Sequence, residues 1–330
     1  MKRSSVIIIG GGPAGLAAAI GAASEGIDVT LVDANHHLGG QAATSTLIEN
    51  YMGFPAVTGK ELMYNAVIQA SKFGVNLRAP FRVIDLIKKE NQWTVTSDDG
   101  EPLTADMVLI ASGVEYQSLN ATNISWFLGN GIMYGSPYMK ESFQNLRVAV
   151  VGGGNSAGQA AFWLASQNGC EVNLIIRGPS LEKDMSDYLI QKVQKCENIK
   201  LLHNTEIIEA HGDQTGLKKL SLSTAEGVKE LDVERLYIMI GTRPKTAWLH
   251  NTICKDEKGF ILAGSQIPPE NWNQWHIDRP PFSNEAAPGL FVSGDTHMDN
   301  PRRIVTAIGD AFGAVISMHK YIALNHRSTE

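Results

Sequence analysis

The chain has 330 residues, of which 43% are hydrophobic and 19% charged, and its formal net charge is -6. This length predicts about two domains with an ample buried core, while the scattered basic residues argue against a nucleic-acid partner. No apolar run approaches the roughly 18 residues of a membrane span, and the N-terminus lacks the pattern of a signal peptide, so we expect a cytoplasmic protein without membrane contacts.

The chain opens with a complete strand–helix–strand unit. Residues 6–9 form a short apolar run that is typical of a buried parallel strand, residues 16–24 predict a helix of small side chains, and residues 27–33 predict the next strand. Glycines spaced Gly-x-Gly-x-x-Gly lie between the first strand and the helix. In this context the spacing indicates a dinucleotide-binding turn.

Each position of this turn has a physical task. The first glycine makes the tight turn, the second lets the backbone approach a pyrophosphate, and the third lets helix and strand pack closely. The helix N-terminus offers N–H groups and positive potential to the phosphates, and an acidic residue after the second strand can accept a hydrogen bond from the adenosine ribose. The predicted residues of this site are Gly10, Gly12, Pro13, Ala14, Gly15 and Asp33.

The same arrangement returns at residue 148. Gly152 stands where Gly10 stands in the first unit, an offset of 142 residues, and the offset grows to 143 after the helix. Between the two units, residues 107–110 predict another buried strand of the first fold. The repeat therefore predicts a second dinucleotide fold inserted in the first.

The second unit departs from the first at two positions. Ala157 replaces the third glycine, which the pattern allows, and Ile176 followed by Arg177 replaces the acidic residue that would select NAD. A guanidinium fits a 2′-phosphate, so the sequence favours NADP(H); a lobe that binds no nucleotide and serves as scaffold is the alternative. The candidate NAD(P) residues are Gly152, Gly154, Asn155, Ser156, Ala157, Arg177 and Gly241.

The C-terminal region predicts a strand from residue 259, a loop rich in Pro and Trp over 264–282, a strand that ends in Gly-Asp, and a helix over about 303–323. We expect a surface loop with anchored aromatics, with a partner surface or a lid as alternatives. An Asp after such a strand can bind a flavin ribityl or pyrophosphate group, and the helix N-terminus can favour the negative charge that develops on a reduced flavin. The candidate residues are Gly294, Asp295, Arg303, Ile304 and Val305.

These patterns predict an α/β protein with two Rossmann-like dinucleotide-binding domains of the three-layer ββα type, the second inserted in the first. Residues 1–115 and 246–330 form the expected FAD-binding domain, and residues 116–245 form the expected NAD(P)-binding-like domain. The cysteines match no metal-site spacing, so no metal is expected.

Seven segments carry a family resemblance: GGGPAGLAAA, GGQ, ENYMGFP, ASG, VVGGGNSAGQAA, MIGTRP and GLFVSGD. In order and spacing they resemble the thioredoxin reductase branch of the FAD-dependent pyridine-nucleotide oxidoreductases. The resemblance implies a homodimer of two-domain subunits, in which the smaller domain rotates to bring nicotinamide or a redox disulfide to the flavin. It also implies that Gln41 and Asn50 lie near the isoalloxazine and Val83 near the adenine, and that Gly40, Ala111 and Gly113 help to bind FAD.

The chain departs from this family at the redox centre. Where thioredoxin reductases carry Cys-x-x-Cys, this sequence has Gly135 and Tyr138. A dithiol relay from flavin to thioredoxin is therefore not expected. Tyr134 and Tyr138 are the candidate flavin-facing residues in its place, with half-buried packing as the alternative. The three cysteines, Cys170, Cys196 and Cys254, lie far apart and are predicted to be buried thiols.

The resulting hypothesis is an FAD-dependent oxidoreductase that passes electrons from NAD(P)H, or from a protein donor, through the flavin directly to a small-molecule or protein acceptor. One alternative resembles ferredoxin/flavodoxin–NADP reductase, for which only Tyr321 offers an aromatic side chain to stack on the flavin. Another alternative is a flavoprotein or flavin sensor with a degenerate second lobe. The resemblance implies a cluster of basic residues for the 2′-phosphate of NADPH, and this sequence keeps only Arg177 of it. This loss motivates the second alternative, whereas the intact Gly152 and Gly154 count against it.

Overall fold

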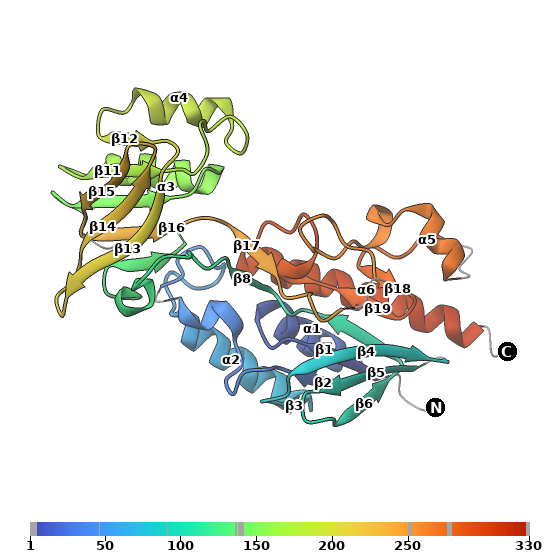
Figure 1. The fold of residues 1–330 in the computed structure, drawn as a ribbon. Coiled ribbons are helices and arrows are strands. Elements are labelled where there is room, and N and C mark those ends of the chain that lie inside the picture. Colours follow the sequence, from blue (N-terminus) through green and yellow to red (C-terminus); the bar gives the residue numbers. More distant parts are fainter. Residues whose placement is uncertain are drawn as a thin grey trace. The chain divides into compact units, whose positions relative to one another are not determined.

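The computed structural model describes residues 5–45, 47–90, 92–135, 137, 142–249, 253–275 and 279–327. The chain forms two compact units: unit 1 consists of Met1–Glu115 and Arg243–Glu330, and unit 2 of Tyr116–Thr242 (Figure 1). Each unit has a mainly parallel sheet, with helices on one face and an antiparallel sheet on the other. The predicted α/β fold with two Rossmann-like domains is confirmed.

The main sheet of unit 1 has the strand order β18-β19-β7-β1-β2-β3, in which β18 runs antiparallel to β19 and the other neighbours are parallel. Val6 and Ile8 of the central strand pack toward the helices, whereas Ile7 and Ile9 pack toward the antiparallel sheet. Both faces are buried, which explains the continuous apolar run. The bounds are β1 Ser5–Ile9, β2 Asp28–Val32, β3 Asn76–Arg78, β7 Met107–Ile110, β18 Glu285–Ala287 and β19 Leu290–Val292.

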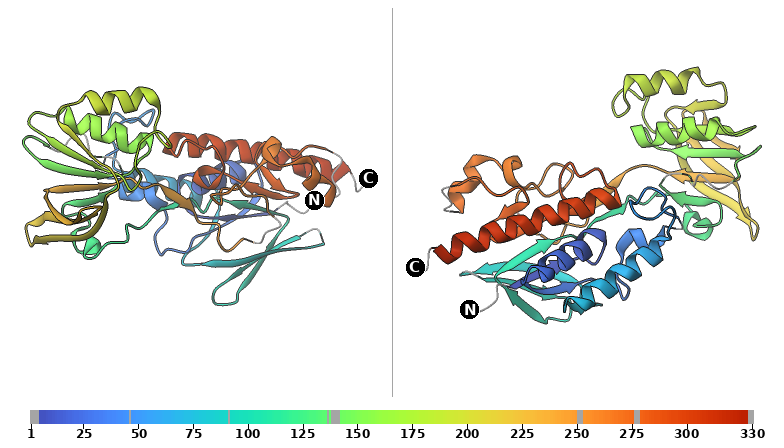
Figure 2. Two further views of the ribbon diagram at one scale, coloured as in Figure 1. Left: turned by 45° about the horizontal axis from the view of Figure 1, so that its top comes forward. Right: turned by 180° about the vertical axis from the view of Figure 1, so that it is seen from behind.

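Helices cover one face of this sheet, and α1 lies against α6 (Figure 2). The small side chains of α1 let it approach both the sheet and α6. A three-stranded antiparallel sheet covers the other face. The bounds are α1 Pro13–Ser24, α2 Gly59–Lys72 and α6 Ile304–Arg327 for the helices, β4 Val83–Lys89, β5 Gln92–Ser97 and β6 Pro102–Ala105 for the strands, and η1 Gly40–Thr44 for a short 3-10 helix.

Unit 2 repeats this plan with the parallel strand order β12-β11-β10-β16-β9. Helices α3 (Asn155–Ala165) and α4 (Asp187–Lys195) pack on one face, and an antiparallel sheet packs on the other. The parallel strands are β9 Ile132–Tyr134, β10 Arg147–Val151, β11 Glu171–Ile175, β12 Ile199–Leu202 and β16 Arg235–Ile238. The antiparallel strands are β13 Glu206–Asp213, β14 Gly216–Thr224 and β15 Gly227–Asp232, and η2 spans Ile124–Phe127.

The chain passes between the units at two short strands, β8 (Val114–Tyr116) and β17 (Thr242–Pro244), which pair with each other. The two crossings between the units thus have regular backbone hydrogen bonding. Arg243 and Glu115 add an ion pair of 2.6 Å between Nε and Oε1 next to these strands.

The strand predicted from residue 259 is wrong. Asp256 N–H donates to the carbonyl of Phe260, and the Asp256 carboxylate accepts the Phe260 N–H, so the chain turns tightly there. Beyond this turn Ile261 makes isolated bridges to Lys255 and His297. The backbone groups that a strand would need are used by the turn.

The region predicted as a loop over 264–282 contains the short helices η3 (Gly264–Gln266) and α5 (Pro269–Gln274). Proline suits the first position of a helix, and this explains where α5 begins. The same rule starts α1 at Pro13, three residues before its predicted start. The aromatic side chains are anchored, since Trp275 packs against the core of unit 1 and the guanidinium carbon of Arg279 lies 3.8 Å from the ring centre of Phe282.

Within the described part of the chain, no helix combines the length and the apolar character that crossing a membrane requires.

Candidate functional site

The turn between β1 and α1 has the geometry of a phosphate-binding loop. Gly10 has a φ of +112°, and a Cβ there would lie 2.3 Å from the carbonyl oxygen of Ala111. A Cβ on Gly15 would lie 1.8 Å from the carbonyl oxygen of Gly10. At Gly12, the N-cap of α1, the nearest atom to a Cβ is the Cα of Gly40 at 3.8 Å. The fold therefore requires the outer two glycines, whereas the middle one leaves open space at a helix N-terminus, where a pyrophosphate fits.

Asp33 follows β2 directly, and only 8% of its surface is exposed. Its Oδ2 accepts the N–H of Gly11 at 2.7 Å, and its Oδ1 accepts the backbone N–H and side-chain amide of Asn35 at 2.8 and 2.9 Å. Asp33 thus holds the glycine turn against β2, a task that the sequence did not predict. Oδ2 keeps a second acceptor site, whereas both acceptor sites of Oδ1 are used, so the ribose contact stays a prediction.

The turn between β10 and α3 repeats this geometry in unit 2. Gly152 has a φ of +146°, and a Cβ there would lie 2.4 Å from the carbonyl oxygen of Met239. Gly154 is the N-cap of α3, and a Cβ there would come no closer than 3.7 Å to the Asp184 carbonyl oxygen. Ala157 is fully buried at the place of the third glycine. Unit 2 therefore has the same open position at a helix N-terminus.

The other predicted residues of unit 2 lie around this turn. The Asn155 side chain accepts the N–H of Ser186 at 2.9 Å and so ties α3 to the start of α4. Arg177 is exposed at the carboxyl end of β11, and no described side chain pairs with it. Ser156 is exposed in the first turn of α3, and the Gly241 carbonyl accepts the N–H of Gln117 at 3.1 Å.

After β19 the chain turns through η4 (Gly294–Thr296) toward the first turn of α1. A Cβ on Gly294 would lie 2.6 Å from the Cβ of Ala14, so a glycine is needed for this approach. Asp295 is partly buried and hydrogen-bonds to no described residue. Burial raises the pKa of Asp295, and the charge of Arg302 opposes this effect. A partly buried carboxylate without a partner at the end of a parallel strand suits a ligand hydroxyl.

The N-terminus of α6 supplies two of the three backbone groups predicted for it. The helix begins at Ile304, so the N–H groups of Ile304 and Val305 have no partner within the helix. The N–H of Arg303 instead donates to the hydroxyl of Thr306 at 3.1 Å. Thr306 thus caps the N–H of Arg303, and a contact between Arg303 and flavin stays a prediction.

The residues taken from the family resemblance divide into two groups. Gly40 lies against the glycine turn, since a Cβ there would be 3.0 Å from the Cα of Gly12, and the Gln41 amide donates to the carbonyl of Val114. Asn50 is exposed in the loop closed by the bridge between Ile48 and Val57.

The second group borders the sheet of unit 1. Val83 begins β4, and Ala111 N–H continues the ladder with Ile9 O at 2.8 Å. The Gly113 carbonyl accepts the hydroxyl of Thr296 at 3.1 Å. The predicted residues that the structure brings together at the N-terminus of α1 are Gly10, Gly12, Ala14, Gly15, Gly40, Ala111 and Gly294.

Of the three cysteines, Cys170 is buried, as predicted, whereas Cys196 and Cys254 are partly exposed. All three are free thiols. Burial raises the pKa of Cys170 to about 11, and burial also raises the pKa of Cys254. Thiols with a raised pKa stay protonated near neutral pH and are poor nucleophiles.

Tyr134 lies in the segment where the family carries its Cys-x-x-Cys pair, while Tyr138 lies outside the described residues. The ring of Tyr134 stacks on Tyr116, with centres 5.5 Å apart and planes 26° apart. The Tyr134 hydroxyl accepts the N–H of Leu119 at 3.2 Å. Tyr134 thus packs, partly buried, within unit 2, and a contact with flavin stays a prediction.

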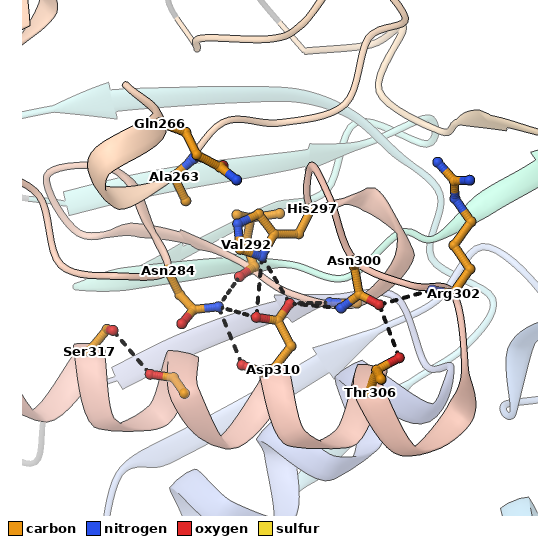
Figure 3. A network of polar contacts seen from close by, with 12 residues as sticks. Ala263, Gln266, Asn284, Val292, His297, Asn300, Arg302, Thr306, Asp310 and Ser317 are labelled. Carbon is orange, nitrogen blue, oxygen red and sulfur yellow. Dashed lines mark hydrogen bonds and ion pairs between the residues drawn. The ribbon is translucent and has the colours of Figure 1, made fainter. Parts of the chain in front are cut away.

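Sequence reasoning missed a polar network beneath η4 (Figure 3). The Asp310 carboxylate of α6 accepts the N–H of Gly294 at 2.9 Å and the Asn284 amide at 2.7 Å, and it lies 3.0 Å from Nδ1 of His297. Burial acts to raise the pKa of Asp310, but the hydrogen bonds from His297, Asn284 and Gly294 lower it overall. A charged residue on the buried face of α6, close to Ala307 and Ala311, was the signal that could have revealed this network.

Tyr321 is partly buried and packs against the core of unit 1. It packs edge-on against Phe291, with ring centres 6.1 Å apart, and burial raises its pKa. The ring is thus engaged within unit 1, and the stacking role that the sequence offered for Tyr321 stays a prediction. Among the described residues, no group of three His, Cys, Asp or Glu side chains is placed to hold a metal ion.

Two glycine turns of one geometry, each between a parallel strand and a helix, define a two-lobed dinucleotide-binding protein. The sequence profile of the family described as "Pyridine nucleotide-disulphide oxidoreductase" matches residues 4–311. The chain belongs to this family and is an oxidoreductase and flavoprotein of thioredoxin reductase-like fold, as predicted, with FAD and NADP(H) as its expected cofactors.

Its relatives include thioredoxin reductases. The chain is 31% identical to thioredoxin reductase 1 of Saccharomyces cerevisiae over 98% of this chain and 99% of the relative. It is 30% identical to the thioredoxin reductase of Ureaplasma parvum, over 97% of this chain and 97% of that protein. In fold it resembles the solved thioredoxin reductase of Giardia duodenalis, with a TM-score of 0.77, 24% identity, and coverage of 98% of this chain and 100% of the other.

Proposed function

We propose that this chain takes electrons from NAD(P)H, with a preference for NADPH, and passes them through FAD directly to an acceptor without a protein disulfide. The observation that carries the proposal is the repeated glycine turn: Gly12 in unit 1 and Gly154 in unit 2 both leave open space at a helix N-terminus. Two such turns provide for two dinucleotides. Unit 1 is the proposed FAD-binding domain and unit 2 the proposed NAD(P)-binding domain.

The residues of unit 1 fit FAD. The N-terminus of α1 at Gly12 would hold the pyrophosphate, Asp33 the adenosine ribose, and the unpartnered carboxylate of Asp295 a ribityl hydroxyl. FAD, when bound, supplies the ring that accepts a hydride and releases electrons to an acceptor. The first turn of α6 presents the N–H groups of Ile304 and Val305, whose positive potential favours the negative charge of a reduced ring.

Direct transfer to the acceptor is supported by the state of the thiols. The cysteines are free, Cys170 is buried with a pKa of about 11, and the sequence has Gly135 and Tyr138 where a redox pair would stand. A dithiol relay needs a thiolate that attacks and a partner thiol that resolves the mixed disulfide. Reduction of thioredoxin is therefore not part of the proposed activity, and the acceptor is a small molecule or a protein that reacts with the flavin itself.

A flavoprotein that does not use a pyridine nucleotide is the second candidate function. It is favoured by one observation at β11: buried Ile176 replaces the acidic residue, and Arg177 is the remaining cation of the family's basic cluster. Such a lobe would hold the adenosine end of a nucleotide weakly.

An anaerobic titration tests the proposal. NADPH, added to the purified FAD-bound protein, is expected to bleach the oxidised-flavin absorbance faster than NADH does. The matched control is one triple variant in which Cys170, Cys196 and Cys254 are all replaced by serine. NADPH should reduce its flavin at the same rate as in the parent protein. A large loss in the control would show that a thiol takes part and would contradict direct transfer. Bleaching by dithionite but by neither nucleotide would favour the second candidate, and a protein that takes up no FAD would overturn both.

We further propose that two copies of this chain form a homodimer through α6. Phe312 and Ile316, one turn apart on this helix, are 44% and 58% exposed, so two large apolar side chains face solvent on one side of α6. Ile316→Glu is expected to shift the protein from dimer to monomer in sedimentation velocity, because it places a charge in an apolar contact. Val228→Glu, at a 68% exposed position of β15, is the control and should leave the dimer intact. An unchanged dimer in both variants would show that this face of α6 is not the dimer interface.

A further inference from the structure

We infer that Asp310 is a positioning residue for the flavin, which fixes the Gly294–Asp295 turn and the first turn of α6 in one geometry. The inference rests on the proposed function of unit 1. It assigns a task to a side chain that binds no cofactor in the proposed site, and the argument has three steps.

The first step concerns the turn that precedes Asp295. Asp310 Oδ2 accepts the N–H of Gly294 at 2.9 Å, and Gly294 has a φ of +74°. The carboxylate thus holds the start of the turn, while the His297 N–H closes it on the Gly294 carbonyl at 3.0 Å. The other carboxylate oxygen accepts the amide of Asn284 at 2.7 Å. Asn284 in turn donates to the carbonyl of Val292 at 3.1 Å, which fixes the end of β19. The direction in which Asp295 leaves the sheet therefore depends on Asp310.

The second step leads from Asp310 to the N-terminus of α6 (Figure 3). The Asn300 amide donates to Asp310 Oδ2 at 3.3 Å, and its carbonyl oxygen accepts the Thr306 hydroxyl at 3.2 Å. The same Asn300 oxygen accepts the N–H of Arg302 at 3.2 Å. Thr306 caps the N–H of Arg303. A continuous chain of hydrogen bonds thus joins the proposed ribityl contact to the proposed contact at the flavin ring.

The third step concerns His297, the remaining donor. Its Nδ1 lies 3.0 Å from Asp310 Oδ2, and the side chains of His297 and Asp310 are only 14% and 17% exposed. An ionised carboxylate accepts hydrogen bonds only, so the proton of the imidazole lies on Nδ1. The buried Nε2 has no hydrogen-bond partner among the described residues. Among the described residues the His297 ring therefore contacts Asp310 through Nδ1 only, and this contact restricts the rotation of the carboxylate.

The test compares Asp310→Asn with Asp299→Asn. An amide at position 310 would turn an NH₂ group toward donors such as Gly294 N–H, and the turn would shift. Asp299 is exposed in the same loop, makes no hydrogen bond with a described residue, and has a φ of +63° that Asn adopts readily. Both variants remove one negative charge, but only the first changes the network. FAD affinity, the visible spectrum of the bound flavin and its rate of reduction by NADPH are measured, together with thermal unfolding of the apoprotein.

We expect Asp310→Asn to reduce the flavin-reduction rate about 10- to 100-fold and to change the flavin spectrum, since a displacement near 1 Å has effects of this size. Asp299→Asn should behave like the parent protein. A parental spectrum and rate in Asp310→Asn, or equal losses in both variants, would overturn the inference. If the parent protein binds no FAD, the proposed function itself has failed, which is a distinguishable result.

A second pair of variants covers the case that Asp310→Asn does not fold. His297→Asn keeps a side-chain donor in reach of Asp310, whereas His297→Leu has a similar volume and no donor. We expect the spectrum and the reduction rate to be closer to the parent values in His297→Asn than in His297→Leu. Equal behaviour of the two would contradict a role through the hydrogen bond to Asp310.

Discussion

Gly12→Ala is expected to weaken FAD binding about 10- to 100-fold while the apoprotein keeps its fold. The new methyl would lie 3.8 Å from the Cα of Gly40, which is an ordinary contact, and the φ of -79° at position 12 suits alanine. The same methyl would occupy the space into which a pyrophosphate must come. Overpacking of this kind costs about 1–3 kcal/mol, and each 1.4 kcal/mol corresponds to about tenfold in affinity. Flavin fluorescence titration and thermal unfolding of the apoprotein measure the two effects separately.

Gly154→Ala is the matched control, because position 154 has the same place in unit 2, and its nearest neighbour would be 3.7 Å away. It should leave FAD affinity unchanged and weaken the binding of NADPH. Parental FAD affinity in Gly12→Ala would show that the pyrophosphate does not lie at this turn. A drop of FAD affinity in Gly154→Ala would contradict the assignment of cofactors to units.

The second large effect is expected from a buried ion pair. Glu285 is 1% exposed at the side chain and binds Arg279 through two contacts, Nη1–Oε2 at 2.7 Å and Nη2–Oε1 at 3.0 Å. Glu285→Ala would leave the guanidinium, which is 25% exposed, without its partner. Breaking a buried pair in this way costs about 3–5 kcal/mol in free energy of unfolding, and we expect a value near the lower limit because Arg279 keeps some contact with water. Denaturant unfolding measures this difference.

A surface pair supplies the control. Glu230 lies 2.6 Å from the amino group of Lys219 and is exposed, so Glu230→Ala should have no measurable effect on stability. Replacing both partners of the buried pair, in Arg279→Met with Glu285→Met, should restore part of the loss, because no unpaired charge then remains. Equal stability of Glu285→Ala and the parent protein would show that the pair does not anchor this part of unit 1.

The sequence predicted those parts of the fold in which local pattern and burial agree. The strands around Ile8 and Leu109 are buried on both faces and therefore appear as continuous apolar runs, and the turns at Gly10 and Gly152 follow from close backbone approach. The antiparallel sheet of β13, β14 and β15 could not be predicted in the same way. In β14, exposed side chains interrupt the buried apolar ones, so the strand has no continuous apolar run. β15 is exposed along most of its length.

The sites were predictable where one segment forms them and not where several segments meet. The glycine turns and Asp295 could be predicted as candidates because each fingerprint lies within a few residues. The network at Asp310 escaped prediction because its partners Asn284, Gly294 and His297 come from other elements and are joined only by the fold. The cap on Arg303 was missed for a related reason, since a threonine three residues later competes for its N–H.

The different spatial requirements of the two glycines in each turn have a consequence for how this chain changes over generations. A side chain at Gly152 would collide with a backbone carbonyl, so the fold alone retains this glycine whether or not a ligand binds. Gly154 has no such protection, and serine, asparagine or aspartate at a helix N-cap would stabilise α3 at least as well. Random substitution in a lobe without a ligand would therefore fill position 154 long before position 152. A glycine still stands there, which favours a second lobe that continues to be selected for binding a nucleotide.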